Sequence, residues 1–411
     1  MIRKIKNFFH FLTAILANLI YRFPSKKLIM IGVTGTDGKT TTVHLIGHLL
    51  KKNGFKVGII STLSSPGLHT TTPDPFVLQK ILRQMVNKGK RYVVLECSSH
   101  GLDQYRLWGI KFQIGVVTNV THDHLDYHKS WENYAQAKGK LLENSQIVVL
   151  NKDDYSYEYF FKNPKIKRKK IITYAIKNEA DFTPKNFPFK TKLPGEYNQY
   201  NCLAGIAVAV NLGIKPGKIK KALISFKGVK GRMEEIKMGQ KFKVFVDFAK
   251  TASGLENALK TLKPLVNQGR LIAVFGSAGL RDIAKRKMMG EVAGRLANIA
   301  ILTAEDPRTE DVNKIINQIA EGCLEGGMEE KKEEEIKQEN ELKEEKWFIR
   351  IPDRRKAIRF AIEKLAKNGD ILVFCGKGHE RSMCYGKKEY PWNEFLEVKK
   401  AIRRRLFKNV S

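Results

Sequence analysis

Cysteine is scarce in this chain and is never paired in the sequence. The 411 residues contain five cysteines, and none of them belongs to a C-x-x-C pair. Such pairs are typical of zinc ribbons, and disulfide frameworks are typical of small secreted domains. The scattered cysteines argue against both classes and favour a reducing cytoplasm.

The chain also lacks an apolar run that is long enough to cross a membrane. The run NFFHFLTAILANLIYRF (7–23) falls short of the roughly 20 apolar residues of a spanning helix. No small-residue cleavage site follows it, so it does not fit a secretory signal. Helical spacing places its large apolar residues on one side: Phe8, Leu12, Ile15, Leu16 and Leu19. We expect an amphipathic helix over 1–26, which either contacts a membrane surface through residues 1–23 or packs on the first domain.

Acidic residues are far fewer than basic ones. The chain has 74 Lys and Arg against 42 Asp and Glu, a formal net charge of +32. This balance is compatible with nucleic acid, an anionic membrane surface or phosphorylated substrates. The excess is mostly lysine spread along the chain, without an aromatic–arginine module of the RNA-binding kind, so we expect no nucleic-acid partner.

Short strand-like runs alternate with helical patterns in two series. The first series comprises 28–35, 56–62, 91–97, 112–120 and 145–151, and the second comprises 242–249, 271–279, 299–306 and 370–378. Alternation of this kind predicts an α/β fold. We expect a central P-loop-type ATPase domain with a mostly parallel sheet over 27–230 and a C-terminal Rossmann-like α/β domain over 231–411. A lysine-rich passage (151–192) interrupts the first, and the charged stretch 328–346 is expected to be a solvated helix or a disordered insertion.

A glycine-rich loop, GVTGTDGKTTT (32–42), stands where a strand-like run passes into a helix. Backbone N–H groups at such a helix start can cradle phosphate, Lys39 can reach the β/γ-phosphates, and the Thr40 hydroxyl can hold Mg²⁺. Val33 replaces the first glycine of the usual G-x-x-x-x-G-K-[ST] spacing. The predicted nucleotide-binding residues are Gly35, Thr36, Asp37, Gly38, Lys39, Thr40 and Thr41.

Carboxylates and histidines follow the next strand-like runs. Glu96 ends one run, and Asp123, His124 and Asp126 come after another. No H-E-x-x-H motif or cysteine set supports zinc. The pattern therefore predicts magnesium-assisted phosphoryl transfer.

Eight motifs occur in the order found in the Mur ligases: GTDGKTT, LECSSHGLDQYR, TNVTHDHLDYH with YAQAKGKLL, GEYNQYNCLAG, GRMEEI, FGSAGLRDIAKR, EDPRTED and GKGHE. The chain resembles this family from about residue 28 to 385, most of all the UDP-N-acetylmuramoyl-tripeptide synthetases. The resemblance implies a cytoplasmic ATP-dependent ligase of peptidoglycan synthesis. A carboxylate of a muramoyl-L-Ala-D-Glu acceptor would form an acyl phosphate with ATP, and the amine of an amino acid would displace the phosphate.

The resemblance also implies residue roles. Lys39, Glu96, His124 and Lys138 would be catalytic, with two Mg²⁺ ions held by Thr40, Glu96, His124 and a carbamylated Lys138. Asn201 would contact adenine, and Arg232 and Asp247 would complete the nucleotide site. The muramoyl-peptide would be bound by Thr71, Thr72, Ser98, Gln104 and Arg106. The amino-acid pocket would contain Arg281, Asp306, Arg308, Gly376 and Glu380.

The second amino acid is expected to be meso-diaminopimelate. An ammonium group beside Arg308 would be repelled, which favours diaminopimelate over lysine. The site is expected to lie between the two domains and to require their closure. We expect the enzyme to be a monomer.

Three features depart from the family pattern. The family's D-Y-A-H-T-P-D reads DFAKTASG (247–254), so Lys250 replaces a histidine, although it could still touch phosphate. Glu305 and Asp306 replace Asp-Asn of the diaminopimelate pattern D-N-P-R. About 27 residues precede the first strand, too few for the UDP-gripping domain, so the carrier of the acceptor, UDP or lipid, stays open. The alternatives are a lipid II isoglutaminyl synthase-like or folylpolyglutamate-synthetase-like ligase, and a non-catalytic nucleotide-binding scaffold.

Overall fold

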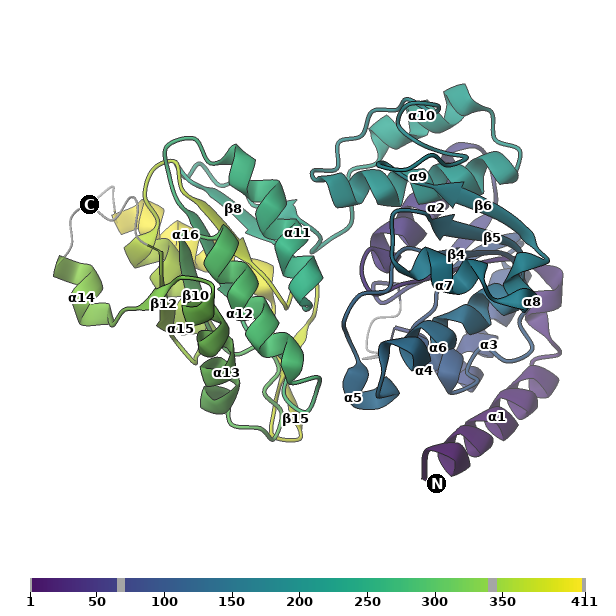
Figure 1. Ribbon diagram of the computed structural model, residues 1–411, viewed down its shortest axis with the longest axis horizontal. Coiled ribbons are helices and arrows are strands. Elements are labelled where there is room, and N and C mark those ends of the chain that lie inside the picture. The colour runs from purple at the N-terminus through teal and green to yellow at the C-terminus, as the bar shows by residue number, and fades with distance from the viewer. Residues whose placement is uncertain (1, 65–70, 339–345, 409–411) are drawn as a thin grey trace. The chain divides into compact units, whose positions relative to one another are not determined.

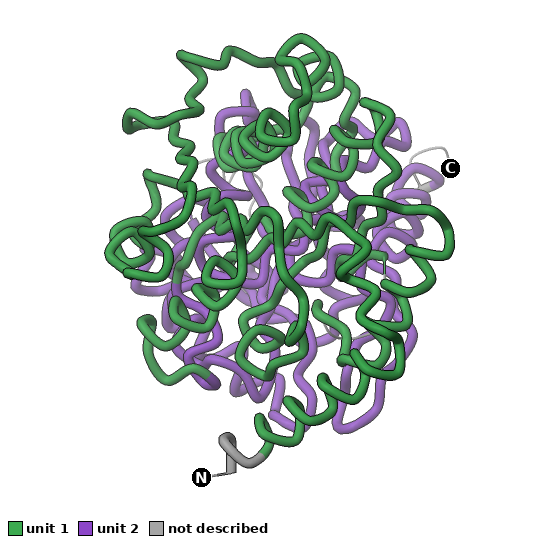
Figure 2. The backbone as a smooth tube through the Cα atoms, turned by 90° about the vertical axis from the view of Figure 1, so that its right-hand side faces the viewer, with its two compact units in different colours: residues 1–121, 128–228 green, residues 122–127, 229–411 purple. Residues whose placement is uncertain are grey.

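The chain folds into two compact units. The computed structural model describes residues 2–64, 71–338 and 346–408. Residues 1–121 and 128–228 form unit 1, and residues 122–127 and 229–411 form unit 2 (Figure 2). The short segment 122–127 interrupts unit 1 in the sequence but groups with unit 2, so the chain passes between the units three times.

Unit 1 contains a six-stranded sheet in the order β2-β3-β1-β4-β5-β6, and every pair in it is parallel. Figure 1 labels β4, β5 and β6 of this sheet. Its strands are β1 (Ile29–Thr34), β2 (Val57–Ile60), β3 (Tyr92–Glu96), β4 (Phe112–Val117), β5 (Ser145–Asn151) and β6 (Lys170–Tyr174). Near-continuous burial along β1, β3 and β4 matches a parallel sheet that is covered on both faces. The α/β prediction is confirmed.

Helices cover both faces of this sheet. The helices of unit 1 are α1 (Ile2–Ile20), α2 (Lys39–Lys52), α3 (Pro75–Asn87), α4 (Ser99–Asp103), α6 (Trp131–Glu143), α7 (Ser156–Phe161), α8 (Pro164–Lys167), α9 (Glu196–Asn211) and α10 (Pro216–Ser225). The short α5 (Leu125–His128) lies mostly in the segment 122–127, which groups with unit 2. α3 shows how local sequence sets a boundary: the Asp74 carboxylate accepts from the Phe76 and Val77 N–H groups, and Pro75 occupies the first turn. Leu78 and Leu82 of this helix then pack into the core with Met30 and Val93.

Unit 2 contains a seven-stranded sheet in the order β11-β12-β10-β9-β13-β8-β7, in which only β7 and β8 pair antiparallel. Its strands are β7 (Glu234–Glu235), β8 (Lys243–Val246), β9 (Leu271–Phe275), β10 (Ile299–Leu302), β11 (Glu329–Glu330), β12 (Trp347–Arg350) and β13 (Ile371–Phe374), with a hairpin of β14 (Ser382–Tyr385) and β15 (Lys388–Pro391). Its helices are α11 (Ala252–Leu262), α12 (Ala284–Leu296), α13 (Val312–Glu325), α14 (Glu333–Gln338), α15 (Arg354–Arg359) and α16 (Glu394–Lys408).

Several elements differ from the sequence prediction. β6 lies in the lysine-rich passage 151–192, which was not expected to contain a strand, and β12 was missed altogether. Within the charged stretch 328–346, β11 pairs with β12 and α14 follows it, while residues 339–345 lie outside the described residues.

The five cysteines are free thiols, and four of them are buried. Burial raises the pKa of Cys202 to about 12, so this thiol stays protonated and unreactive near neutral pH.

α1 (Ile2–Ile20), which lies within the predicted N-terminal segment 1–26, packs on unit 1. α1 lies against α3, and the Arg83 guanidinium of α3 donates to the Tyr21 carbonyl just beyond the helix end. Of the two expected placements for this helix, packing on the first unit is therefore present. Among the described residues, no helix is long and apolar enough to cross a membrane.

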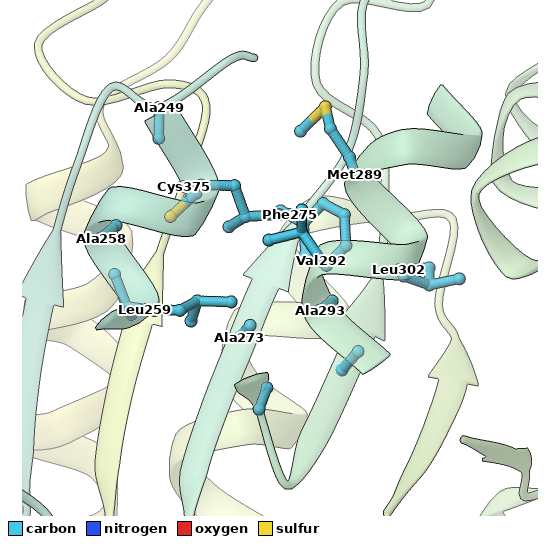
Figure 3. Packing of buried hydrophobic residues seen from close by; sticks show 14 of the residues in the cluster. Ala249, Ala258, Leu259, Ala273, Phe275, Met289, Val292, Ala293, Leu302 and Cys375 are labelled. Atoms are coloured by element: carbon cyan, nitrogen blue, oxygen red, sulfur yellow. The ribbon is translucent and has the colours of Figure 1, made fainter. Parts of the chain in front are cut away.

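The core of unit 2 lies on both faces of its sheet. α11, α12 and α13 cover one face, and α15 and α16 cover the other. Figure 3 shows Phe275, at the end of β9, among Met289 and Val292 of α12 and Cys375 beyond β13. The Phe275 ring is fully buried, so its removal would leave a cavity lined by apolar groups.

Phe275→Ala should lower the unfolding free energy of unit 2 by about 3–5 kcal/mol, because the lost transfer free energy and the cavity add. Native-state hydrogen exchange of the β9 and β10 amides measures this unit by itself. Phe407→Ala removes an identical ring that is 73% exposed in α16, and it should cost less than about 0.5 kcal/mol. Equal losses in the two variants would contradict the assignment of Phe275 to the core.

Candidate active site

The glycine-rich loop 35–38 connects the end of β1 to the first turn of α2. A Cβ on Gly35 would lie 1.8 Å from the Thr118 hydroxyl oxygen, and a Cβ on Gly38 would lie 2.4 Å from Asn201 Oδ1. Gly38 also has a φ of +80°, which L side chains rarely adopt. The loop can therefore follow this path only with glycine at both positions.

Two residues that the sequence analysis did not select hold this loop in place. Asn119 Oδ1 accepts from the backbone N–H groups of Thr36 (3.2 Å) and Asp37 (2.9 Å), and the Thr118 hydroxyl donates to the Asp37 carbonyl at 2.7 Å. In this structure the N–H groups of Thr36 and Asp37 therefore already have an acceptor. Both bracing residues directly follow β4, a position that could have indicated them.

The start of α2 is suited to binding an anion. No side chain caps the helix at Gly38. The N–H groups in the first turn of any α-helix have no acceptor within the helix and point along the positive end of its dipole. A phosphate oxygen could accept hydrogen bonds from them.

Two lysine ammonium groups converge on one carbonyl of the loop. Lys39 Nζ donates to the carbonyls of Gly35 (3.0 Å) and Thr36 (2.8 Å), and Lys138 Nζ donates to the Gly35 carbonyl at 2.6 Å. Lys138 comes from α6, is almost completely buried, and lies 4.2 Å from the centre of the Tyr134 ring. The positive charge of Lys39 at this loop would neutralise phosphate oxygens.

Thr40 and Glu96, two of the predicted metal ligands, are in direct contact. The Thr40 hydroxyl donates to Glu96 Oε1 at 3.0 Å, and Glu96 Oε2 accepts from the backbone N–H and hydroxyl of Thr62. Glu96 ends β3 and is buried, and the carboxylate is held by these hydrogen bonds. A carboxylate and a hydroxyl are hard oxygen ligands, so the donor set fits Mg²⁺.

Four of the predicted muramoyl-peptide residues form one network next to Glu96. Thr72 Oγ1 donates to the Glu96 carbonyl (3.2 Å) and accepts from the Ser98 N–H (2.8 Å). The Arg106 guanidinium donates to the Thr72 carbonyl (2.9 Å) and to Gln104 Oε1 (2.7 Å). Thr71 precedes Thr72 and is half-buried.

Asn201, for which an adenine contact was predicted, lies beside the phosphate loop. It comes from α9, and its Oδ1 accepts from the Thr42 hydroxyl at 3.1 Å while its Nδ2 donates to Asn198. The side chain is buried and approaches Gly38. Thr41 and Thr42 of α2 are buried in the same region of unit 1.

His124 belongs to the segment 122–127 and hence to unit 2, whereas Thr40, Glu96 and Lys138 belong to unit 1. His124 Nε2 lies 3.4 Å from Asp123 Oδ2, and Lys285 Nζ lies 3.5 Å from the other oxygen of that carboxylate. His124 has a φ of +57°, an uncommon value outside glycine. Such local strain is characteristic of functional sites.

Unit 2 contains a compact cluster of opposite charges where β10 and β13 end. Lys250 Nζ lies 2.6 Å from Glu305 Oε1 and 2.8 Å from Glu380 Oε1. Lys377 Nζ lies 2.9 Å from Asp306 Oδ1 and 2.6 Å from Glu380 Oε2. Three carboxylates thus face two ammonium groups, which leaves a net charge of −1 when all five are ionised. Glu305 and Lys377 were not among the predicted site residues.

The charges in this cluster shift one another's protonation. Burial alone would raise the pKa of Glu305, but Lys250 and Lys377 lower it to about 2. Burial and the adjacent Glu305 charge raise the pKa of Asp306. The carboxylates of Glu305 and Glu380 outweigh burial and raise the pKa of Lys250. Any phosphate contact by Lys250 would have to compete with these ion pairs.

Two predicted arginines lie beside the charge cluster. Arg308 Nη1 donates to the Gly279 carbonyl at 3.0 Å, and its backbone N–H donates to the Cys384 carbonyl. Burial and the charge of Arg308 lower the pKa of Arg281. Gly376 lies against Glu305, because a Cβ at Gly376 would come within 2.9 Å of Glu305 Cγ.

Arg232 and Asp247 both lie at the turn that follows β8. Asp247 follows β8, and its carboxylate accepts from the N–H groups of Met233 (2.6 Å) and Ala249 (2.7 Å). The Arg232 guanidinium lies 4.0 Å from the centre of the Phe248 ring, and the Lys250 ammonium lies 4.5 Å from that ring. Asp247 therefore fixes the turn that carries Phe248 and Lys250.

Arg354 supports the strand ends that carry the charge cluster. This fully buried arginine pairs with the fully buried Glu394, and it also donates to the carbonyls of Ala304 and Cys375. These two residues directly precede Glu305 and Gly376. The Arg354–Glu394 ion pair thereby positions the backbone just before Glu305 and just before Gly376.

Comparisons with known proteins identify the family of both units. Residues 33–209 match the Mur ligase middle domain, and residues 231–378 match the glutamate ligase domain of Mur ligases. A UDP-N-acetylmuramoyl-L-alanyl-D-glutamate–2,6-diaminopimelate ligase from Caldanaerobacter subterraneus is 38% identical over 94% of this chain and 80% of that protein.

Solved structures of Mur ligases are similar to this chain in fold. One titled as a UDP-N-acetylmuramoyl-L-alanyl-D-glutamate–2,6-diaminopimelate ligase is 31% identical, with a TM-score of 0.59 over 95% of this chain and 82% of that chain. MurF from Acinetobacter baumannii, 15% identical, has a TM-score of 0.69 over 96% and 81% of the two chains, which shows a shared fold.

Lys250→Met should lower the unfolding free energy of unit 2 by about 3 kcal/mol at pH 7, because it leaves Glu305 buried with less compensating charge. The depressed pKa of Glu305 contributes stability that is present above its unfolded pKa of about 4.5 and is lost as the pH falls towards 2. The difference between wild type and variant should therefore shrink at pH 3.

Hydrogen exchange of the β9 and β10 amides at pH 7 and pH 3 checks this prediction. Lys250→Arg keeps the positive charge, so it should lower the unfolding free energy of unit 2 less than Lys250→Met does. A loss that is the same at both pH values would mean that packing, and not charge compensation, is the role of Lys250.

Proposed function

The chain belongs to the Mur ligase family, and we propose that it is an ATP-dependent ligase that joins meso-diaminopimelate to a muramoyl-L-Ala-D-Glu acceptor. The observation that carries the proposal is the contact between Thr40 and Glu96 beside the lysine-rich phosphate loop of unit 1. This arrangement combines an anion site with hard oxygen ligands, as phosphoryl transfer requires.

The first step would be attack on the γ-phosphate by a carboxylate of the acceptor. The new bond joins the carboxylate oxygen to the γ-phosphorus, the bond to the bridging oxygen breaks, and ADP leaves. Lys39 would neutralise the transferred phosphate, while Asn201, Arg232 and Asp247 would complete the nucleotide site. Thr71, Thr72, Ser98, Gln104 and Arg106 would hold the acceptor so that its carboxylate points at the phosphate.

In the second step the amine of the amino acid attacks the acyl carbon. The C–N bond forms, the C–O bond to phosphate breaks, and the nitrogen loses a proton, so the products are the amide, ADP and phosphate. We assign one Mg²⁺ to Thr40 and Glu96 and a second to His124 and Lys138. Bound magnesium supplies charge neutralisation that permits one anion to attack another.

A carbamate on Lys138 is part of this proposal. A free ammonium in the buried position of Lys138 cannot ligate a cation, whereas a carbamate supplies an anionic oxygen on the same long side chain. The carbamate nitrogen retains one hydrogen, which could still donate to the Gly35 carbonyl.

The charge cluster of unit 2 supports diaminopimelate as the amino acid. Its zwitterionic end carries an ammonium and a carboxylate. Asp306 and Glu380 offer negative charge for the first, and Arg281 and Arg308 offer positive charge for the second. The side-chain ammonium of lysine would meet Arg308 without a carboxylate beside it. We propose that the enzyme acts as a monomer in the cytoplasm, where ATP is available.

Phosphate release should require both an acceptor and an amino acid. We expect meso-diaminopimelate to support release better than lysine in a panel that tests UDP-linked and lipid-linked acceptors side by side. Lys39→Ala should lower kcat/KM by at least about 100-fold, because charge neutralisation at the transferred phosphate is lost. Lys52→Ala, at the exposed far end of α2, is the matched control and should leave kcat/KM unchanged. Phosphate release at the same rate with and without an amino acid would contradict the proposed ligase activity. Equal kcat/KM values for Lys39→Ala and Lys52→Ala would contradict it as well.

Carbamylation can be detected directly. With ¹³C-bicarbonate, the wild-type protein should give a carbamate resonance by NMR that is absent in Lys138→Arg. Lys140→Arg, two residues along α6, should retain it. A resonance of equal intensity in Lys138→Arg would place the modification elsewhere.

A further inference from the structure

α1 is attached to unit 1 through its polar and small residues. Asn7 Nδ2 donates to the backbone carbonyl and the carboxylate of Asp103, both at 3.2 Å, and Asn18 Nδ2 donates to the Trp108 carbonyl at 3.0 Å. Ala14 and Ala17 are fully buried on the same side. Phe11 also takes part, and it packs edge-on against Tyr105 and Trp108.

The large apolar side chains of α1 point the other way. They are between 44% and 63% exposed: Phe8, Phe9, Leu12, Leu16, Leu19 and Ile20. At 100° per residue, all six fall within an arc of about 120°, centred roughly opposite the attached side. We call these six residues the apolar face of α1.

This arrangement is the reverse of what a surface helix normally shows. A helix of a globular protein buries its apolar stripe and exposes its polar side. Single exposed leucines are common, but six contiguous large apolar residues, on the order of 500 Å², mark a surface that meets a partner. Hydrogen bonds of Asn7, Asn18 and Arg83 hold the helix in the orientation that exposes this face.

Charges around the helix indicate the class of partner. Residues 1–36 contain six basic residues and no Asp or Glu. Four of the basic side chains are described and all are exposed: Lys6, Arg22, Lys26 and Lys27. An apolar face flanked by lysine and arginine is the pattern that inserts at the headgroup level of anionic bilayers. Pairing of two copies through α1 would instead bring these like charges together.

We propose that the apolar face of α1 docks unit 1 on an anionic membrane surface. The side chains of Phe8, Phe9, Leu12 and their neighbours enter the boundary between headgroups and acyl chains, and the basic residues contact lipid phosphates. The helix lies in the plane of the interface. This inference rests on unit 1 alone and does not depend on the ligase chemistry, so phosphate release and membrane binding can fail separately.

Co-sedimentation of the full chain with vesicles tests the proposal. The wild-type protein should bind vesicles of phosphatidylglycerol and phosphatidylcholine at least tenfold more strongly than vesicles of phosphatidylcholine alone, and 0.5 M salt should weaken the binding. Leu12→Glu/Leu16→Glu should reduce binding at least tenfold, and Lys26→Glu/Lys27→Glu should reduce it on the anionic vesicles only. Ile224→Glu/Leu324→Glu alters exposed apolar residues elsewhere and should bind like wild type.

Thermal unfolding by circular dichroism shows whether each variant is folded. If Leu12→Glu/Leu16→Glu does not fold, Lys26→Glu/Lys27→Glu tests the proposal instead. Equal soluble fractions with and without anionic vesicles would overturn the proposal. So would binding that does not distinguish the two vesicle types. A dimer in analytical ultracentrifugation that Leu12→Glu/Leu16→Glu abolishes would show instead that the face joins two copies of the chain.

Discussion

Parallel pairing of the strands is the constraint on which the candidate sites depend. In a parallel sheet the carboxyl ends of the strands lie along one edge, and the residues just beyond them leave the backbone ladder together. In unit 1 that edge carries Gly35, Glu96 and Thr118, which follow or end β1, β3 and β4. In unit 2 it carries Asp247, Glu305 and Gly376 beyond β8, β10 and β13. Residues far apart in the sequence thus come into contact without any special loop.

Buried charge at these edges is balanced locally in each unit. Glu96 is held by the hydroxyls of Thr40 and Thr62 and a backbone N–H, and Lys138 meets a carbonyl and an aromatic ring. The five charged groups of unit 2 neutralise one another except for one negative charge. An arrangement of apolar residues would avoid the cost of desolvating these ions. Buried charged groups at both sheet edges suit the binding of charged substrates. A charged group of the substrate could replace one of the ion-pair partners that the protein supplies.

Much of the architecture was predictable from periodicity, because buried parallel strands are short apolar runs followed by glycine or polar residues. β6 escaped detection since its residues, KIITY, lie at a sheet edge within a lysine-rich passage, and β12 because WFIR follows a highly charged stretch. Motifs identified Lys39, Thr40 and Glu96. They did not identify Asn119 and Lys377, whose importance comes from contacts across the fold, nor that Lys250 would pair with Glu305. Such pairings depend on tertiary distances that no local pattern encodes.

The segment 122–127 has a consequence for how the chain can be divided. Asp282, just before α12, is buried. Its carboxylate accepts a hydrogen bond from the Leu125 N–H and lies 3.0 Å from His122 Nε2. Both partners come from the stretch that interrupts unit 1 in the sequence. A fragment cut at the boundary near residue 229 would therefore keep the whole sheet of unit 2 but strip this carboxylate of two neighbours. The second unit is thus contiguous in space but discontinuous in the sequence, so a version of it that retains both partners of Asp282 must include residues 122–127.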